Sequence, residues 1–102
     1  MELRHIRYFL AVAEEMNFTR AAEKLCIAQP PLSRQIQELE GELEVKLFLR
    51  KPHNLQLTPE GQLFRQYAVR VLDLVAKSTE EVKEIHSGLH GTLYLASVEG
   101  HA

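Results

Sequence analysis

Apolar residues recur at helical spacing in four segments of this chain, and short polar stretches separate the segments. One side of the first segment is apolar and consists of Leu3, Ile6, Leu10 and Ala13, with Phe9 beside them. Such spacing is typical of an amphipathic helix whose apolar face is buried. We therefore expect the chain to begin with a helix that packs on a shared core.

The second segment, FTRAAEKL, has a helix-capping residue at either Asn17 or Thr19. Its two alanines, Ala21 and Ala22, are small enough for another helix to approach closely. The residues CIAQ lead from it into the third segment, which is the tight spacing of a helix-turn-helix unit. Because a helix this short is marginal in water, we expect packing to hold it.

The third segment begins at the adjacent prolines Pro30 and Pro31. Proline is tolerated in the first turn of a helix because the amide hydrogen that it lacks would have no partner there. A core-facing stripe follows at steps of four, three and four residues and consists of Leu32, Ile36, Leu39 and Leu43. The exposed surface at the helix start carries side chains of the types that read base edges, namely Gln29, Ser33, Arg34 and Gln37. Glutamates occupy the far end at Glu38, Glu40, Glu42 and Glu44, where they would repel phosphates. A helix face that is only exposed to solvent does not require its neutral and basic residues to be separated from its acidic residues in this way.

Two brief apolar pieces, residues 47–49 and 55–57, flank a turn that contains Pro52, His53 and Asn54. This pattern predicts a β-hairpin with a basic, polar tip. After a helix-turn-helix unit such a hairpin is a wing, which can lie along a phosphate backbone or enter a minor groove.

Thr58 and Pro59 predict the start of a fourth helix, which runs to about Ser87 and is about 40 Å long. Its apolar residues form a seam like that of a coiled coil. This seam can cover the globular part of the same chain or pair with a second copy, and we favour pairing because so long a helix outreaches so small a core. The residues expected at the dimer interface are Phe64, Tyr67, Ala68, Val71, Leu72, Val75, Val82 and Ile85.

Gly88 and Gly91 end this helix, and the residues TLYLASV that follow resemble the beginning of a buried strand. An apolar strand without a partner is an aggregation liability. We therefore expect the sequence to be the front piece of a longer protein.

The charges are distributed unevenly along the chain, although the net charge is only −2. Residues 17–37 carry Arg20, Lys24 and Arg34 against Glu23 alone, and residues 45–57 carry three basic residues and no acid. One end of the molecule is therefore locally positive, which is a weak electrostatic footprint for nucleic acid.

Other functional classes find little support in the residues. There is no glycine-rich phosphate loop and no cluster of histidines with cysteines or carboxylates, so we expect neither an enzyme nor a cofactor. His86 and His90 have no evident third ligand, which makes a metal site improbable, and His5 reads as a surface residue. Cys26 is the single cysteine of the sequence, and we expect its side chain to be buried in a protein of the reducing cytoplasm. No stretch is long and apolar enough to span a membrane, and none resembles a signal peptide.

The run RYFLAVAEEMNFTRAAEKLCIAQPPLSRQIQELE, followed by LFLR and LTPEG, resembles the N-terminal DNA-binding domain of LysR-type transcriptional regulators. AQPPLSRQI and the first helix are similar to the subgroup that regulates aromatic-compound catabolism. The resemblance covers residues 1–88 and implies a mainly α-helical, winged helix-turn-helix fold. It divides the chain into a DNA-binding domain at 1–58, a linker and dimerisation helix at 59–88, and a hinge with the start of a truncated effector-binding domain at 89–102.

The resemblance also implies partners and site residues. Such homodimers bind an interrupted palindrome in duplex DNA, and full-length members assemble as tetramers that respond to a small-molecule inducer. By position, the residues that match major-groove contacts are Gln29, Pro30, Ser33 and Arg34, with Pro31 in the same helix start. Those that match phosphate contacts are Thr19, Arg20 and Gln35, while Arg50 and His53 match residues near the backbone and minor groove.

Two positions depart from the family pattern. The family usually has glycine after the recognition helix, where this chain has Glu44, so we expect that helix to end differently and the wing to shift slightly. Close relatives often carry arginine at the wing tip, where this chain has His53, so we expect a weaker minor-groove contact that strengthens in mild acid. The rival interpretation is a helix-turn-helix module that dimerises and binds another protein instead of DNA.

Overall fold

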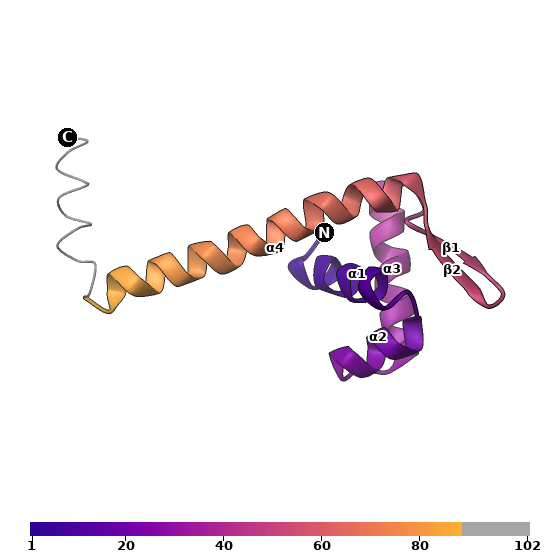
Figure 1. Ribbon diagram of the computed structural model, residues 1–102, viewed down its shortest axis with the longest axis horizontal. Helices are drawn as coiled ribbons and strands as arrows, with labels where there is room; N and C mark the ends of the chain where they lie inside the picture. The colour runs from indigo at the N-terminus through magenta and orange to yellow at the C-terminus, as the bar shows by residue number, and fades with distance from the viewer. Residues whose placement is uncertain (89–102) are drawn as a thin grey trace. The chain divides into compact units, whose positions relative to one another are not determined.

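The computed structural model describes residues 1–88, and these form four helices and one hairpin (Figure 1), as the sequence predicts. The elements are, in order, α1 (Leu3–Glu15), α2 (Phe18–Leu25), α3 (Gln29–Leu43), β1 (Phe48–Lys51), β2 (Asn54–Leu57) and α4 (Pro59–His86). The chain divides into two units, one of residues 1–72 and one that begins at Asp73, so that α4 contributes to both. The strand expected within residues 89–102 lies outside the described residues.

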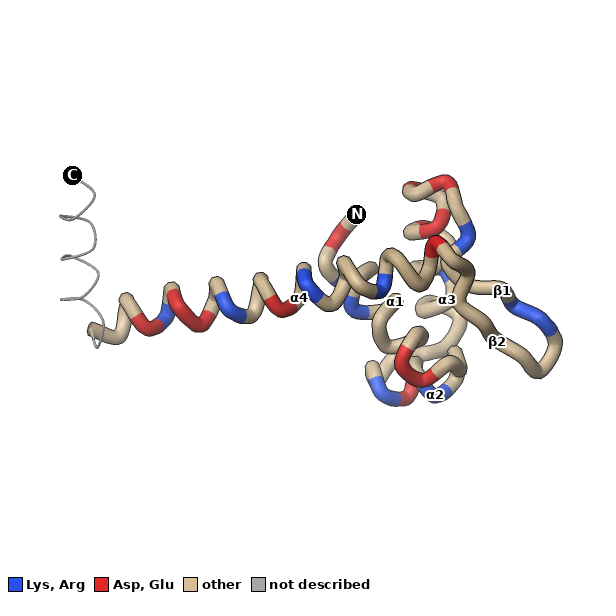
Figure 2. Tube along the Cα trace, turned by 45° about the horizontal axis from the view of Figure 1, so that its top comes forward, with Lys and Arg blue, Asp and Glu red and all other residues tan. Residues whose placement is uncertain are grey.

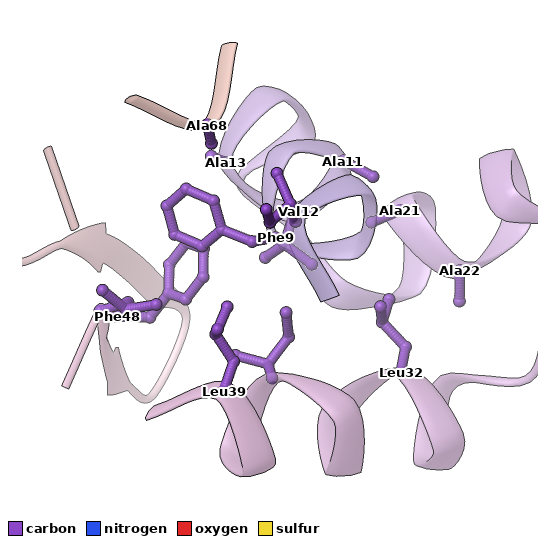
Figure 3. Packing of buried hydrophobic residues seen from close by; sticks show 13 residues of the cluster. Phe9, Ala11, Val12, Ala13, Ala21, Ala22, Leu32, Leu39, Phe48 and Ala68 are labelled. Carbon is purple, nitrogen blue, oxygen red and sulfur yellow. The ribbon is translucent and has the colours of Figure 1, made fainter. Parts of the chain in front are cut away.

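The core of the first unit lies between α1 and α3. Phe9 is fully buried at its centre, with its ring 5.3 Å from that of Phe48 and 5.0 Å from that of Phe64. Figure 3 shows Leu32 and Leu39 pointing from α3 toward α1. The hairpin and the start of α4 are thus joined to the three-helix unit through one aromatic cluster.

Two expectations for α1 are wrong. Leu3 is 38% exposed, because the buried face is centred on Phe9 and Val12 and lies to one side of the predicted stripe. His5 is buried: its Nδ1 accepts the Glu2 N–H at 3.0 Å, and its Nε2 lies 3.3 Å from a Glu38 carboxylate oxygen. The histidine therefore helps to close the first turn of α1 instead of facing solvent.

The first three helices all end at a residue in the left-handed conformation: Met16, Cys26 and Glu44. Glu44 has φ 58° and its N–H donates to the Glu40 carbonyl, so the different helix end that we expected there is wrong. Cys26 is exposed in this capping position, which contradicts its predicted burial. At the other end of α2, Asn17 is the cap, because its side chain accepts the Arg20 N–H at 2.9 Å.

The hairpin begins and ends close to its predicted bounds. Phe48 pairs with Leu57 at its base and Lys51 pairs with Asn54 at its tip, which leaves a two-residue turn of Pro52 and His53. His53, the second residue of this turn, has φ 59°, which lies in the left-handed region that residues other than glycine adopt only occasionally.

Thr58 fixes the start of α4, as predicted. Its hydroxyl accepts the Gly61 N–H at 2.9 Å and donates to the Lys46 carbonyl at 2.6 Å, while its own N–H donates to the Leu47 carbonyl at 3.0 Å. A side chain on Gly61 would overlap the carbonyl oxygen of Leu47. Glycine here permits the helix start to lie directly against the segment that leads into β1.

The seam of α4 falls into two parts. Phe64, Ala68 and Leu72 pack against the core of their own chain, which is the alternative that the sequence left open. Val71 and Val82 are exposed by 37% and 65%, and Tyr67 and Ile85 are exposed as well, while Val75 is half-buried. No helix within residues 1–88 is long and apolar enough to cross a membrane.

Candidate nucleic-acid interface

The first two turns of α3 present an exposed polar surface. Leu32 and Ile36 are fully buried on the inner side, which leaves Arg34 and the two prolines, Pro30 and Pro31, exposed on the outer side. Gln29 and Ser33 are half-buried at the edge of this surface. No hydrogen bond or ion pair within residues 1–88 engages the Arg34 guanidinium, so its donors are available to a ligand.

Arg50 of β1 joins this surface to the hairpin. Its Nη1 donates to the Ser33 hydroxyl at 2.8 Å, and its guanidinium lies 4.3 Å from the centre of the Phe18 ring. Two residues expected to contact DNA, Ser33 and Arg50, are therefore in contact with each other. Phe18 is a member of the site that sequence reasoning missed, because nothing in the local pattern indicates its cationic partner.

A shallow groove lies between the start of α2 and the hairpin. Its polar lining includes Asn17, Thr19, Arg50, Lys51 and His53. Figure 2 shows basic residues on β1, and the hairpin contains no acid. Thr19 and Arg20 are exposed at the first turn of α2, where backbone N–H groups favour anions. The structure thus brings together most of the residues expected near phosphates.

Two of the expected residues fit the surface less well. The Gln35 side-chain oxygen is buried and has no hydrogen-bond partner among the described residues. This oxygen is therefore not presented to the groove. Lys24, which we counted toward the positive end, pairs with Glu14 and Glu15 at 3.2 and 3.6 Å. The hydrogen bond to Glu14 raises the pKa of Lys24, and its charge is already balanced by these acids.

Glu40 is the second residue that sequence reasoning missed, because we grouped it with the glutamates at the far end of α3 that would repel phosphates. It is buried, and one carboxylate oxygen accepts the N–H of Leu47 at 2.7 Å and that of Phe48 at 3.3 Å. These N–H groups belong to the segment that enters β1. Glu40 therefore fixes the hairpin against α3.

Replacing Glu40 by alanine is expected to lower the free energy of unfolding by about 2 kcal/mol, because two N–H groups lose a charged acceptor. Urea denaturation measures this change. Gln37→Ala, at an exposed position of the same helix, is the control and should change the stability by less than about 0.5 kcal/mol. Equal effects of the two substitutions would show that the hydrogen bonds of the buried Glu40 carboxylate do not contribute to the free energy of unfolding.

The side chains of this surface are hydrogen-bond donors and acceptors. It offers a guanidinium, amides and hydroxyls on a convex helix beside a basic hairpin. Within residues 1–88 there is no group of three or more histidines, cysteines or carboxylates that could hold a metal ion. Such donors match the acceptors on base edges and phosphates.

Comparison with known proteins identifies the family. The model described as "Bacterial regulatory helix-turn-helix protein, lysR family" matches residues 3–62. The HTH-type transcriptional regulator BenM of Acinetobacter baylyi is 56% identical over 87 residues, which are 85% of this chain and 29% of BenM. CatR of Pseudomonas putida is 55% identical over 74 residues, or 72% of this chain and 25% of CatR. The chain thus spans less than a third of the length of either relative.

Solved structures of the family have the same fold. The DNA-binding domain of BenM in complex with the catB site 1 DNA has a TM-score of 0.86 and 57% identity, and the match covers 88% of this chain and 97% of that one. The DNA-binding domain of CbnR in complex with DNA has a TM-score of 0.81 and 40% identity, covering 84% of this chain and 99% of that one. The chain belongs to the lysR family of bacterial regulatory helix-turn-helix proteins.

Proposed function

We propose that this chain is the sequence-specific, duplex-DNA-binding part of a transcriptional regulator. The observation that carries the proposal is the exposed Arg34 surface of α3 beside the basic, acid-free hairpin. The family match and the similarity to domains solved in complex with DNA support it. The similarity to BenM and CatR supports the subgroup that controls aromatic-compound catabolism.

In this proposal α3 enters a major groove. Arg34 reads a base edge there, with Gln29 and Ser33 beside it, and the two prolines lie exposed at the same helix start. The hairpin follows the adjacent backbone, with Arg50 and Lys51 on phosphates and His53 toward the minor groove. Thr19 and Arg20 hold the phosphate next to the start of α2. Phosphate contacts set the register, and base contacts supply the specificity.

We further propose that two copies pair through α4. The exposed apolar residues Val71, Val82 and Ile85 support this pairing, since a single chain leaves them in water. The division into a DNA-binding domain at 1–58, a pairing helix at 59–88 and an effector-binding part from 89 follows the same proposal. Tetramer formation and a small-molecule inducer belong to the full-length regulator, which acts on DNA in the bacterial cytoplasm.

Introducing two charges into the exposed seam should separate the dimer. Val71→Glu combined with Val82→Glu is expected to halve the mass measured by sedimentation equilibrium, because four introduced carboxylates, two from each chain, would be buried at the interface. Ala76→Glu combined with Gln66→Glu places the same charges on the other side of α4 and should leave the dimer intact. An unchanged mass for the seam variant would place the interface elsewhere.

The salt dependence of binding tests the function. Neutralising six to ten phosphates makes affinity fall about 10³- to 10⁵-fold between 50 and 200 mM salt, because condensed counterions are released. We expect a steep decrease of this kind for a duplex selected from a random pool. A shallow slope, or no selection of any duplex, would reject DNA binding and favour the protein-interaction module.

A further inference from the structure

We propose that Phe18 is a positioning residue for DNA binding, which acts by holding Arg50 in place. The inference rests on the proposed function and goes beyond it, because the side chain of Phe18 has no group that could donate a hydrogen bond to a phosphate. Its ring lies 4.3 Å from the Arg50 guanidinium carbon, within the range of a cation–π contact. It is thus the aromatic partner of the basic residue that joins the α3 surface to the hairpin.

The Phe18 ring is itself fixed. Phe18 is the first residue of α2 and directly follows Asn17, the cap of this helix. The Asn17 side chain accepts the Arg20 N–H, and this hydrogen bond fixes the backbone of the first turn, to which Phe18 belongs. The ring packs edge-on against Phe48, with centroids 5.9 Å apart, and Phe48 packs on Phe9 in the core. Because the ring is fixed to the core in this way, a guanidinium that stacks on it has a fixed position as well.

The arrangement leaves donors free on Arg50. A guanidinium has five N–H donors. One of them serves the Ser33 hydroxyl at 2.8 Å, and the face of the group is stacked on Phe18. Arg50 is exposed, so its other edge can meet a phosphate oxygen that approaches between α3 and the hairpin. Holding an arginine in one conformation before binding reduces the ordering that binding must otherwise impose.

Three elements meet at this one guanidinium. Phe18 belongs to α2, Ser33 to α3 and Arg50 to β1. The contact therefore couples the recognition helix to the wing on the side that faces the groove, whereas Glu40 couples them on the buried side. Loss of the ring should leave the fold intact, with Arg50 held by the Ser33 hydroxyl alone.

A double-mutant cycle tests this inference. Phe18→Leu keeps an apolar side chain against Phe48 but removes the aromatic face, and Phe18→Tyr keeps the face as a matched control. We expect Phe18→Leu to weaken binding to the selected duplex about 3- to 10-fold. In an Arg50→Met background the same change should have less than a twofold effect, and Phe18→Tyr should bind like the unaltered chain. Thermal unfolding of each variant defines a temperature at which all of them are folded.

Nuclear magnetic resonance tests the contact without DNA. The side-chain Nε–H resonance of Arg50 should be shifted by the ring current of Phe18 and should return toward its ordinary position in Phe18→Leu. Equal losses of affinity in both Arg50 backgrounds, or an Arg50 resonance without a ring-current shift, would overturn the inference. Failure of the proposed function alone would appear differently, as an intact ring-current shift in a protein that binds no duplex.

Discussion

Replacement of Gly61 by alanine is expected to lower the free energy of unfolding by about 3 kcal/mol, at the upper end of what overpacking costs. The new Cβ would overlap the carbonyl oxygen of Leu47 and lie 3.0 Å from a methyl group of Leu57. The carbonyl cannot retreat freely, because it accepts the Thr58 N–H at 3.0 Å. The start of α4 would therefore have to separate from the hairpin, and the Thr58 cap would be strained.

A glycine elsewhere in the chain provides the matched control for this substitution. Gly41 lies in α3, is exposed, and has no atom within 4 Å of the position that a Cβ would take. Gly41→Ala should therefore stabilise the chain by about 0.5–1 kcal/mol through helix propensity. Urea denaturation of the two variants measures effects of opposite sign. Stabilisation by both would show that α4 and the hairpin do not approach each other as closely as the structure has them.

Replacement of Arg34 by alanine is expected to have the largest effect on function. A bidentate arginine contact to guanine contributes about 1–3 kcal/mol of discrimination, and a dimer loses that contact in both half-sites. The affinity for the selected duplex should therefore fall by about 2–6 kcal/mol, while binding to random duplex should change little. Arg34 has no partner within residues 1–88, so its removal should not affect folding.

Fluorescence anisotropy with the selected and a random duplex measures this difference. Arg7→Ala, at an exposed position of α1, removes the same charge away from the interface and should leave both affinities within about threefold. Equal losses on the two duplexes for Arg34→Ala would make Arg34 a phosphate contact. In that case another residue of α3 would have to read the bases.

The fold could be predicted largely from local patterns. The apolar spacing of α3, the proline at the start of α4 and the turn between two apolar pieces each depend on neighbouring residues alone. Periodicity is read along the chain, so it gives the elements reliably. It could not place Leu3, because the centre of a helix's buried face depends on which other helices pack against it.

The residues that sequence reasoning misjudged depend on contacts distant in the chain. Glu40 follows Ile36 by one helical turn, which is a local signal for its buried side, but its partners are N–H groups of the segment before β1. Phe18 meets Arg50 over a separation of 32 residues, and His5 meets Glu38 over 33. Such pairs become visible only when the elements are packed. The exposed polar face of α3 could be predicted because the helical spacing of its apolar residues, which is read from neighbouring positions, shows which side is buried.

Chemical footprinting on the selected duplex tests the central claim most directly. Dimethyl sulfate methylates guanine N7, which lies in the major groove and is an acceptor that Arg34 would occupy. We predict that the bound protein protects guanine N7 in two half-sites, and that Arg34→Ala removes the protection at one position of each. If every guanine N7 of the bound duplex reacts as it does in free DNA, α3 does not lie in the major groove and the account is contradicted.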